Sequence, residues 1–182
     1  MQRGLEQAAP QRAATIKVWD PLVRIVHWTV ATGCFLNLFL VEDGDAHDII
    51  GYAVLAAMTL RIVWGFVGPG HARFSDFVRG PREIRNYIQD NLRGHARRYI
   101  GHNPAAAVMM LALMALVIAV SVTGYMMGTD TFWGEEWLED LHEFFANSIL
   151  VLALLHALAA ILESYRHKEN LVWSMVTGRK RR

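Results

Sequence analysis

Four long, nearly uncharged stretches constrain the fold of this chain more than any other feature. They cover residues 21–41, 47–67, 104–127 and 141–165. Each reaches or exceeds the roughly 20 residues that an α-helix needs to cross a hydrocarbon core about 30 Å thick. Hydrophobic residues make up 53% of the 182 residues, which is high for a soluble protein. The sequence therefore predicts an all-α fold, a four-helix transmembrane bundle in a single domain.

The charges in the connecting segments have opposite signs at the two ends of the predicted bundle. Residues 42–46 and 128–140 contain acidic side chains and no Lys or Arg, whereas both tails and residues 68–103 are rich in Lys and Arg. With four spans, both tails and residues 68–103 lie on one side, which the positive-inside rule makes cytoplasmic. We therefore expect a multi-pass membrane protein with both termini in the cytoplasm.

This topology divides the chain into a cytoplasmic tail at residues 1–20, a transmembrane domain at 21–166 and a basic cytoplasmic tail at 167–182. The first tail lacks the apolar segment of a cleaved signal peptide. In the cytoplasmic loop 68–103, the spacing predicts a short amphipathic helix that starts at Pro81 and lies on anionic lipid headgroups. We expect membrane lipid, and no nucleic acid, as the partner of these arginines, because the topology already accounts for them.

Four of the eight histidines fall inside the predicted spans or at their ends: His27, His47, His142 and His156. His142 and His156 are fourteen residues apart, so on one helix they point the same way and lie about 21 Å apart along the axis. The topology places His47 and His142 near the outer face, and His27 and His156 nearer the cytoplasm. Ionisable side chains are costly inside a membrane and indicate function. The sequence therefore predicts two bis-histidine sites stacked across the bundle.

Two imidazoles are axial ligands that suit haem iron, and a flat apolar macrocycle suits the interior of a helical bundle. A zinc site needs three or four ligands, and the acidic neighbours Asp48 and Glu143 point about 100° away from the adjacent histidines. The single cysteine, Cys34, excludes a covalent CxxCH haem site. Histidines held only by hydrogen bonds, and a chain of histidines that relays protons, are alternatives that spacing leaves open.

Arg61 and Gly51 are further candidates for the haem sites. Arg61 lies fourteen residues after His47, on the same helix face at the depth of the inner site, where it would pair with haem propionates. The alternative is that Arg61 extends its side chain about 9 Å to the cytoplasmic surface. Gly51, one turn after His47, either lets a macrocycle edge approach or serves helix packing.

The chain resembles the prokaryotic di-haem cytochrome b family of the cytochrome b561 type, which includes the b-type cytochrome subunits of nickel–iron hydrogenases and formate dehydrogenases. The resemblance covers essentially everything after residue 16. It rests on the segments VWDPLVRIVHW, HDIIGY, RIVWGFVGPGHARFSDFVRGP, GHNPAA, LHEFFAN, LLHALAAILE and ENLVWSMVTGRKRR.

This resemblance implies a four-helix bundle that holds two non-covalent b haems, with His27, His47, His142 and His156 as axial ligands. It also implies electron transfer between the quinone pool and a redox partner, either a hydrogenase-like subunit or a periplasmic cytochrome c. We expect an electron-transfer subunit of an oxidoreductase, without a catalytic residue of its own.

A quinone site near the inner haem would need hydrogen-bonding groups where the third span begins, and His102 and Asn103 are the candidates. The alternative is that Asn103 only caps the helix that starts at Pro104. Two further functions stay open: a stand-alone oxidoreductase that exchanges electrons between superoxide and quinone, and a haem-free membrane anchor or transporter.

Overall fold

The computed structural model describes residues 14–95 and 97–182. Four long helices dominate it: α1 (Pro21–Phe39), α2 (Gly44–Val67), α5 (Pro104–Met127) and α6 (Glu136–His167). Each of them is long and apolar enough to cross a membrane, which confirms the predicted helical transmembrane fold. Most side chains of these helices face outward, as expected of helices that contact lipid.

The helix ends differ slightly from the predicted spans. The first helix stops at Phe39, while the last one extends beyond the apolar stretch at both ends, from Glu136 to His167. Its first turn contains Glu136 and Glu139, and its last turn contains Arg166 and His167. Acidic residues stabilise the start of a helix and basic residues its end, so hydropathy alone underestimates the length of α6.

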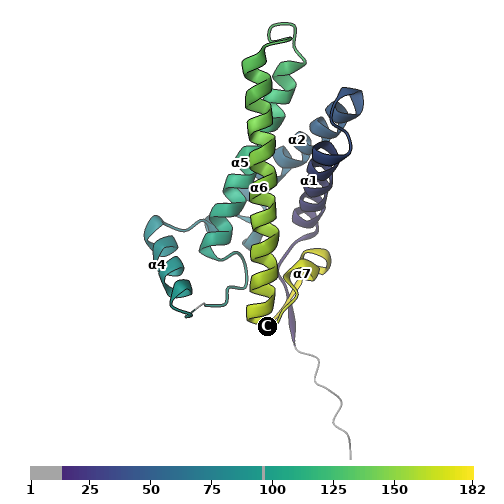
Figure 1. Cartoon of the computed structure of the whole chain (residues 1–182). Coiled ribbons are helices and arrows are strands. Elements are labelled where there is room, and N and C mark those ends of the chain that lie inside the picture. The colour runs from purple at the N-terminus through teal and green to yellow at the C-terminus, as the bar shows by residue number, and fades with distance from the viewer. Residues whose placement is uncertain (1–13, 96) are drawn as a thin grey trace, which may run out of the picture.

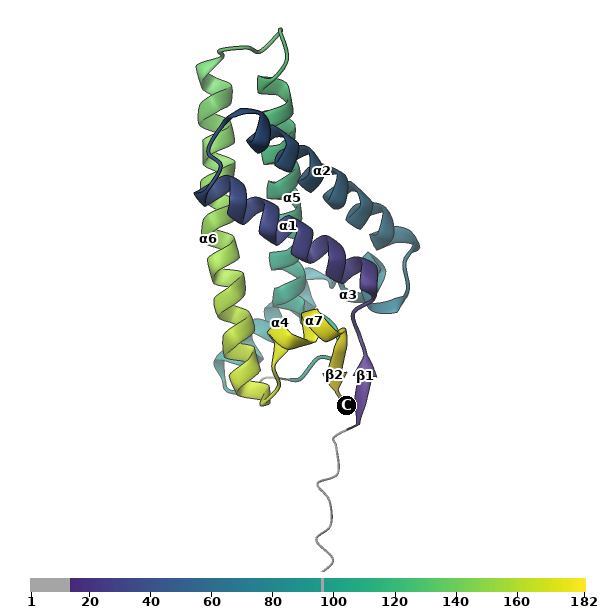
Figure 2. The ribbon, with the colours of Figure 1, turned by 90° about the vertical axis from the view of Figure 1, so that its right-hand side faces the viewer.

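The four long helices form two antiparallel hairpins. Helix α1 packs on α2, α5 packs on α6, and contact between α2 and α5 joins the two hairpins. Figure 1 shows α5 and α6 side by side, and Figure 2 shows α1 and α2 running obliquely to them. Helices α1 and α6, both described in full, are not among the pairs that pack closely. The buried apolar core is formed by Val54, Met58, Met114, Val117 and Ile149.

We call the end of the bundle formed by residues 14–20, 68–95, 97–103 and 168–182 the basic end, and that formed by 40–43 and 128–135 the acidic end. The basic end contains the short helices η1 (Gly70–Ala72), α3 (Phe74–Phe77) and α4 (Pro81–Leu92). Helix α4 starts at Pro81 as predicted, and it lies to one side of the bundle (Figure 1).

The last segment of the chain is not the plain basic tail that we expected. It forms helix α7 (Leu171–Thr177) and strand β2 (Arg179–Arg181), which pairs antiparallel with β1 (Thr15–Lys17). Figure 2 shows this two-stranded sheet beside α7 at the basic end. The rest of the predicted N-terminal tail, residues 1–13, lies outside the described residues.

Candidate functional site

The structure brings together the four histidines in the two pairs that their depths predicted. The rings of His27 on α1 and His156 on α6 have centroids 6.5 Å apart. Those of His47 on α2 and His142 on α6 have centroids 6.2 Å apart. Helix α6 therefore supplies one histidine to each pair, and the first hairpin supplies the other.

These separations suit one metal ion between two imidazoles. A ring nitrogen lies about 1 Å from its ring centroid and about 2 Å from a bound metal, so two rings on opposite sides of one ion are about 6 Å apart. Within residues 14–95 and 97–182, no group of three or more His, Cys, Asp or Glu side chains could hold a metal. Each pair thus offers two protein ligands, which suits the axial positions of haem iron and not a zinc site.

Hydrogen bonds orient both histidines of the pair near the acidic end. Nδ1 of His47 lies 2.8 Å from the backbone oxygen of Val41, and because a carbonyl can only accept, Nδ1 carries the proton. Nδ1 of His142 lies 3.0 Å from Oγ1 of Thr123, whose own proton is directed to the Val120 carbonyl at 3.0 Å. Nε2 of each ring therefore has a free lone pair, as a metal ligand requires.

Thr123 was missed by sequence reasoning, although a signal was present. It is a buried hydroxyl, 5% exposed, inside a largely apolar helix. Buried polar groups in helices are normally hydrogen-bonded, so a threonine facing the predicted histidine face is a candidate for a partner of the ligand.

A pocket lies against the His47–His142 pair, and its lining includes Gly51, Gly124 and Asn37. A Cβ atom at Gly51 would meet only the Asn37 amide nitrogen at 4.0 Å, so helix packing does not require glycine there. The missing side chain keeps this face of α2 open to the pocket, which supports the predicted approach of a macrocycle. At Gly124, a Cβ atom would lie 3.1 Å from Cε1 of His142, so this glycine makes room for the ring.

Arg61 is buried near the basic end, with 5% of its surface exposed. Its guanidinium lies over the ring of Phe74, 5.6 Å from the centroid, and among the described residues neither Nη1 nor Nη2 has a hydrogen-bond partner. The side chain therefore does not extend to solvent, which was the alternative to a role in the site. A buried cation without an acceptor is costly, so the position suits an anionic group such as a carboxylate.

His102 and Asn103 have different roles in the structure. The side-chain oxygen of Asn103 accepts a 2.7 Å hydrogen bond from the Ala106 amide, so Asn103 caps α5. His102 is half-buried between the rings of Trp19 and Phe77, at centroid distances of 4.7 and 4.9 Å. Its Nδ1 is out of contact with solvent and lacks a hydrogen-bond partner in the described part of the chain.

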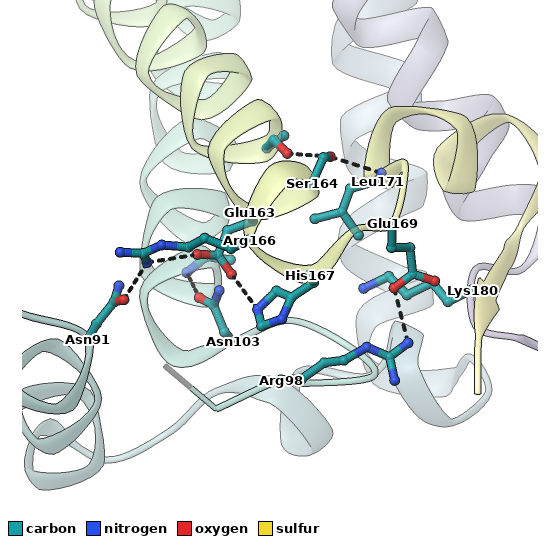
Figure 3. Close-up of polar contacts among 12 residues, drawn as sticks. Asn91, Arg98, Asn103, Glu163, Ser164, Arg166, His167, Glu169, Leu171 and Lys180 are labelled. Atoms are coloured by element: carbon teal, nitrogen blue, oxygen red, sulfur yellow. Dashed lines mark hydrogen bonds and ion pairs between the residues drawn. The ribbon is translucent and has the colours of Figure 1, made fainter. Parts of the chain in front are cut away.

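Burial, together with the positive charges of Lys180 and Arg61, lowers the pKa of His102 to about 3. The ring is therefore neutral at physiological pH. Of the remaining histidines, His71 and His95 are exposed. His167 is half-buried, with Nε2 3.2 Å from a Glu163 carboxylate oxygen (Figure 3).

Known proteins similar to this chain are described as b-type cytochromes. The family model described as Prokaryotic cytochrome b561 matches residues 18–178. A probable Ni/Fe-hydrogenase B-type cytochrome subunit from Rhodobacter capsulatus is 27% identical, over 93% of this chain and 83% of the relative. Proteins of the same description from Bradyrhizobium diazoefficiens and Cupriavidus necator are 27% and 26% identical, over 91% and 96% of this chain and 86% and 92% of each relative. No solved structure matches significantly. The chain therefore belongs to the prokaryotic cytochrome b561 family and is a multi-pass, haem-binding membrane protein of electron transport.

Proposed function

We propose that the chain holds two b haems, one between His27 and His156 and the other between His47 and His142. The observation that carries this proposal is the pair of ring separations, 6.5 and 6.2 Å, each of which accommodates one metal ion. The hydrogen bonds from Nδ1 of His47 and His142 support it, because they leave Nε2 of each ring free. The unpartnered guanidinium of Arg61 supports a carboxylate-bearing cofactor at the basic end.

Haem b with both axial positions filled supplies one-electron ferric/ferrous chemistry without an open coordination site. The histidines therefore serve to bind and orient, and the protein is a relay for electrons and not a catalyst by itself. His142 and His156 are fourteen residues apart on α6, about 21 Å along its axis, so the two sites lie at different membrane depths.

The electron partners that we propose are the quinone pool at the basic end and a redox protein at the acidic end. His102 has a neutral ring beside Trp19 and Phe77, and its buried Nδ1 has no partner within the described part of the chain, so it is free to hydrogen-bond a quinone oxygen. The connections at the acidic end carry Glu and Asp and would attract a basic patch on a partner. Because several relatives are described as hydrogenase subunits, we favour a hydrogenase-like partner over a cytochrome c.

We further propose that the basic end faces the cytoplasm and that the protein resides in the inner membrane. The support is the positive-inside rule: arginines and lysines are concentrated in the loop between α2 and α5 and in the last segment. The acidic end then faces the periplasm, where a hydrogenase-like partner would dock.

Reduction by quinol tests the proposed function. The haem-loaded protein in liposomes is mixed with ubiquinol, and the b-haem absorbance is followed. We expect reduction of the wild type and slower reduction of His102→Leu, with the same final level after dithionite, because this substitution removes the hydrogen-bonding ring but no haem ligand. His95→Leu, the same change at an exposed position, should match the wild type.

Failure of ubiquinol to reduce the wild type, or equal rates in the two variants, would contradict the quinone assignment. Turnover of superoxide with quinone by the isolated chain would favour the stand-alone oxidoreductase. Membership of a cytochrome family argues against the haem-free anchor or transporter.

A further inference from the structure

Lys180 is a buried lysine in a strand whose other residues are exposed. Only 7% of its surface is accessible, whereas Arg179 and Arg181 on either side are exposed. Its ammonium lies over the ring of Trp19 at 5.2 Å and at 3.5 Å from the backbone oxygen of Gly101. Among the described residues it forms no ion pair. Lysine is almost never buried without a partner, so this position calls for an anion.

A second buried cation lies nearby. Arg61 reaches the same region from α2, and neither of its Nη atoms has a partner in the described part of the chain. Lys180 lies over Trp19, and Arg61 lies over Phe74, which packs against Phe77. The rings of Trp19 and Phe77 both contact His102. Two buried cations therefore lie against the aromatic side chains around His102.

The carboxylates near these cations already have other partners. Near Lys180, Glu169 pairs with Arg98 and Glu163 pairs with Arg166 and His167. Asp20 is the carboxylate near Arg61. Oδ1 of Asp20 accepts a hydrogen bond from the Val23 amide at 3.1 Å and caps α1. Oδ2 of Asp20 accepts from Nε1 of Trp64 at 3.3 Å. Asp20 thus stabilises the start of α1, and within residues 14–95 and 97–182 it is not in ion-pair distance of either cation.

We propose that Lys180 and Arg61 together bind the propionate carboxylates of the haem held by His27 and His156, so that strand β2 forms part of this haem site. The inference rests on the proposed function. A neutral quinone does not require two cations, whereas a haem carries two carboxylates on one edge. Both cations lie near the basic end, and of the two proposed sites the one with His156 is nearer to that end, eleven residues before the end of α6.

Strand pairing and several hydrogen bonds fix the position of Lys180. Ile16 of β1 pairs with Lys180, and the alternation of the strand turns Lys180 inward. Glu169 accepts a hydrogen bond from the Arg98 guanidinium at 3.0 Å (Figure 3). It also accepts one from the backbone N–H of Arg181. The hydroxyl of Ser164 accepts from the Leu171 amide at 3.0 Å and fixes the start of α7. The last strand is thereby attached to α6 and to the loop before α5.

The test is a redox titration of the haem-loaded full chain at one pH, comparing Lys180→Met with the wild type. Removal of a cation beside the propionates favours the ferric state, so we expect the midpoint potential of one haem to fall while the other stays unchanged. Arg61→Gln should lower the potential of the same haem. Lys17→Met is the matched control, because Lys17 is an exposed lysine of the same two-stranded sheet, and it should change neither potential.

Resonance Raman spectra distinguish a direct ion pair between Lys180 and a haem propionate from an effect of the lysine charge on the midpoint potential over a longer distance. We expect the propionate bending mode of one haem to shift in Lys180→Met and to remain in place in Lys17→Met. Unchanged potentials and an unchanged bending mode in Lys180→Met would overturn the inference. If Lys180→Met does not fold, the wild-type protein alone tests the inference. A propionate bending mode at the frequency typical of carboxylates without hydrogen bonds would then overturn it. Fewer than two haems in the wild type would instead count against the proposed function.

Discussion

Thr123 places a single hydroxyl between the backbone of α5 and the ring of His142. It accepts from Nδ1 of His142 at 3.0 Å and directs its own proton to a carbonyl one turn earlier. Such partners fix the tautomer and rotation of a ligand ring, and their loss typically costs about 10–100-fold in metal affinity. The two histidine pairs differ here, because Nδ1 of His27 has no hydrogen-bond partner among the described residues.

At this residue we predict that Thr123→Val lowers haem occupancy at the His47–His142 site. Valine has the same shape but leaves the Nδ1 proton of His142 buried without an acceptor, at a cost of about 1–3 kcal/mol. Loss of this hydrogen bond also makes the ring a poorer electron donor, so the midpoint potential of that haem should rise. Haem content and a redox titration of the purified variant check both effects.

Thr123→Ser should restore the wild-type values, because serine keeps the hydroxyl. Thr59→Val serves as the control: Thr59 also donates to a carbonyl one turn earlier, Leu55 at 2.8 Å, but it is exposed. An equal loss of haem in Thr59→Val and Thr123→Val would show that the effect is general and not due to His142.

At the scale of elements, β1, α7 and β2 form a cap whose geometry depends on Gly178. This glycine ends α7 with φ of 77°, and its carbonyl accepts from the amides of Val18 and Trp19 at 2.9 and 3.1 Å. A Cβ atom at Gly178 would lie 2.6 Å from the backbone oxygen of Trp19. Neither a left-handed conformation nor this close approach suits a residue with a side chain.

We predict that Gly178→Ala opens the cap. The left-handed conformation alone costs alanine about 1–2 kcal/mol, and the contact with the Trp19 oxygen adds to this. Hydrogen–deuterium exchange of residues 14–20, followed by mass spectrometry, should therefore become faster. Gly134→Ala is the matched control, since Gly134 has φ of 75° and no neighbouring atom within 4 Å. Equal exchange of residues 14–20 in both variants would contradict the account of the cap.

The sequence predicted the long elements far better than this cap. Each span is a continuous apolar stretch whose length alone distinguishes it, and the fourteen-residue spacing of His142 and His156 follows from helix geometry. Strand β2 is the tripeptide Arg179–Arg181, which has no apolar periodicity, and its partner lies at the other end of the chain. Strand pairing between residues so far apart in the sequence leaves no local sequence pattern, so residues 179–181 resembled part of a solvated basic tail.

The same distinction applies to the candidate site. The histidine pairs were predictable, because depth in a membrane follows from position along a span. The partners around them were not: Lys180 approaches the site only because β2 is folded back by α7 and Glu169. Asn103 was predictable as a helix cap because Asn before Pro is a local pattern.

At the scale of the whole molecule, the distribution of charge predicts the orientation in the membrane. In a Cys34→Ser background, we expect Gln89→Cys in α4 to react with a membrane-impermeant maleimide only in inside-out vesicles. Thr131→Cys, in the connection between α5 and α6, should react in intact spheroplasts. The physical reason is the concentration of arginine at the basic end. Labelling with the opposite sidedness would contradict the proposed orientation.

The most direct test of the central claim is the number of haems per chain, measured by a haemochrome assay on detergent-purified wild type, His156→Ala and His47→Ala. The ring separations and the ligand assignments predict two b haems in the wild type and one in each variant. The reduced-minus-oxidised spectra should show that His156→Ala and His47→Ala lose different haems. His102→Leu should keep both haems, since His102 contacts Trp19 and Phe77 and belongs to neither pair. One haem in the wild type, or loss of a haem in His102→Leu with both retained in His47→Ala, would contradict the two-site account.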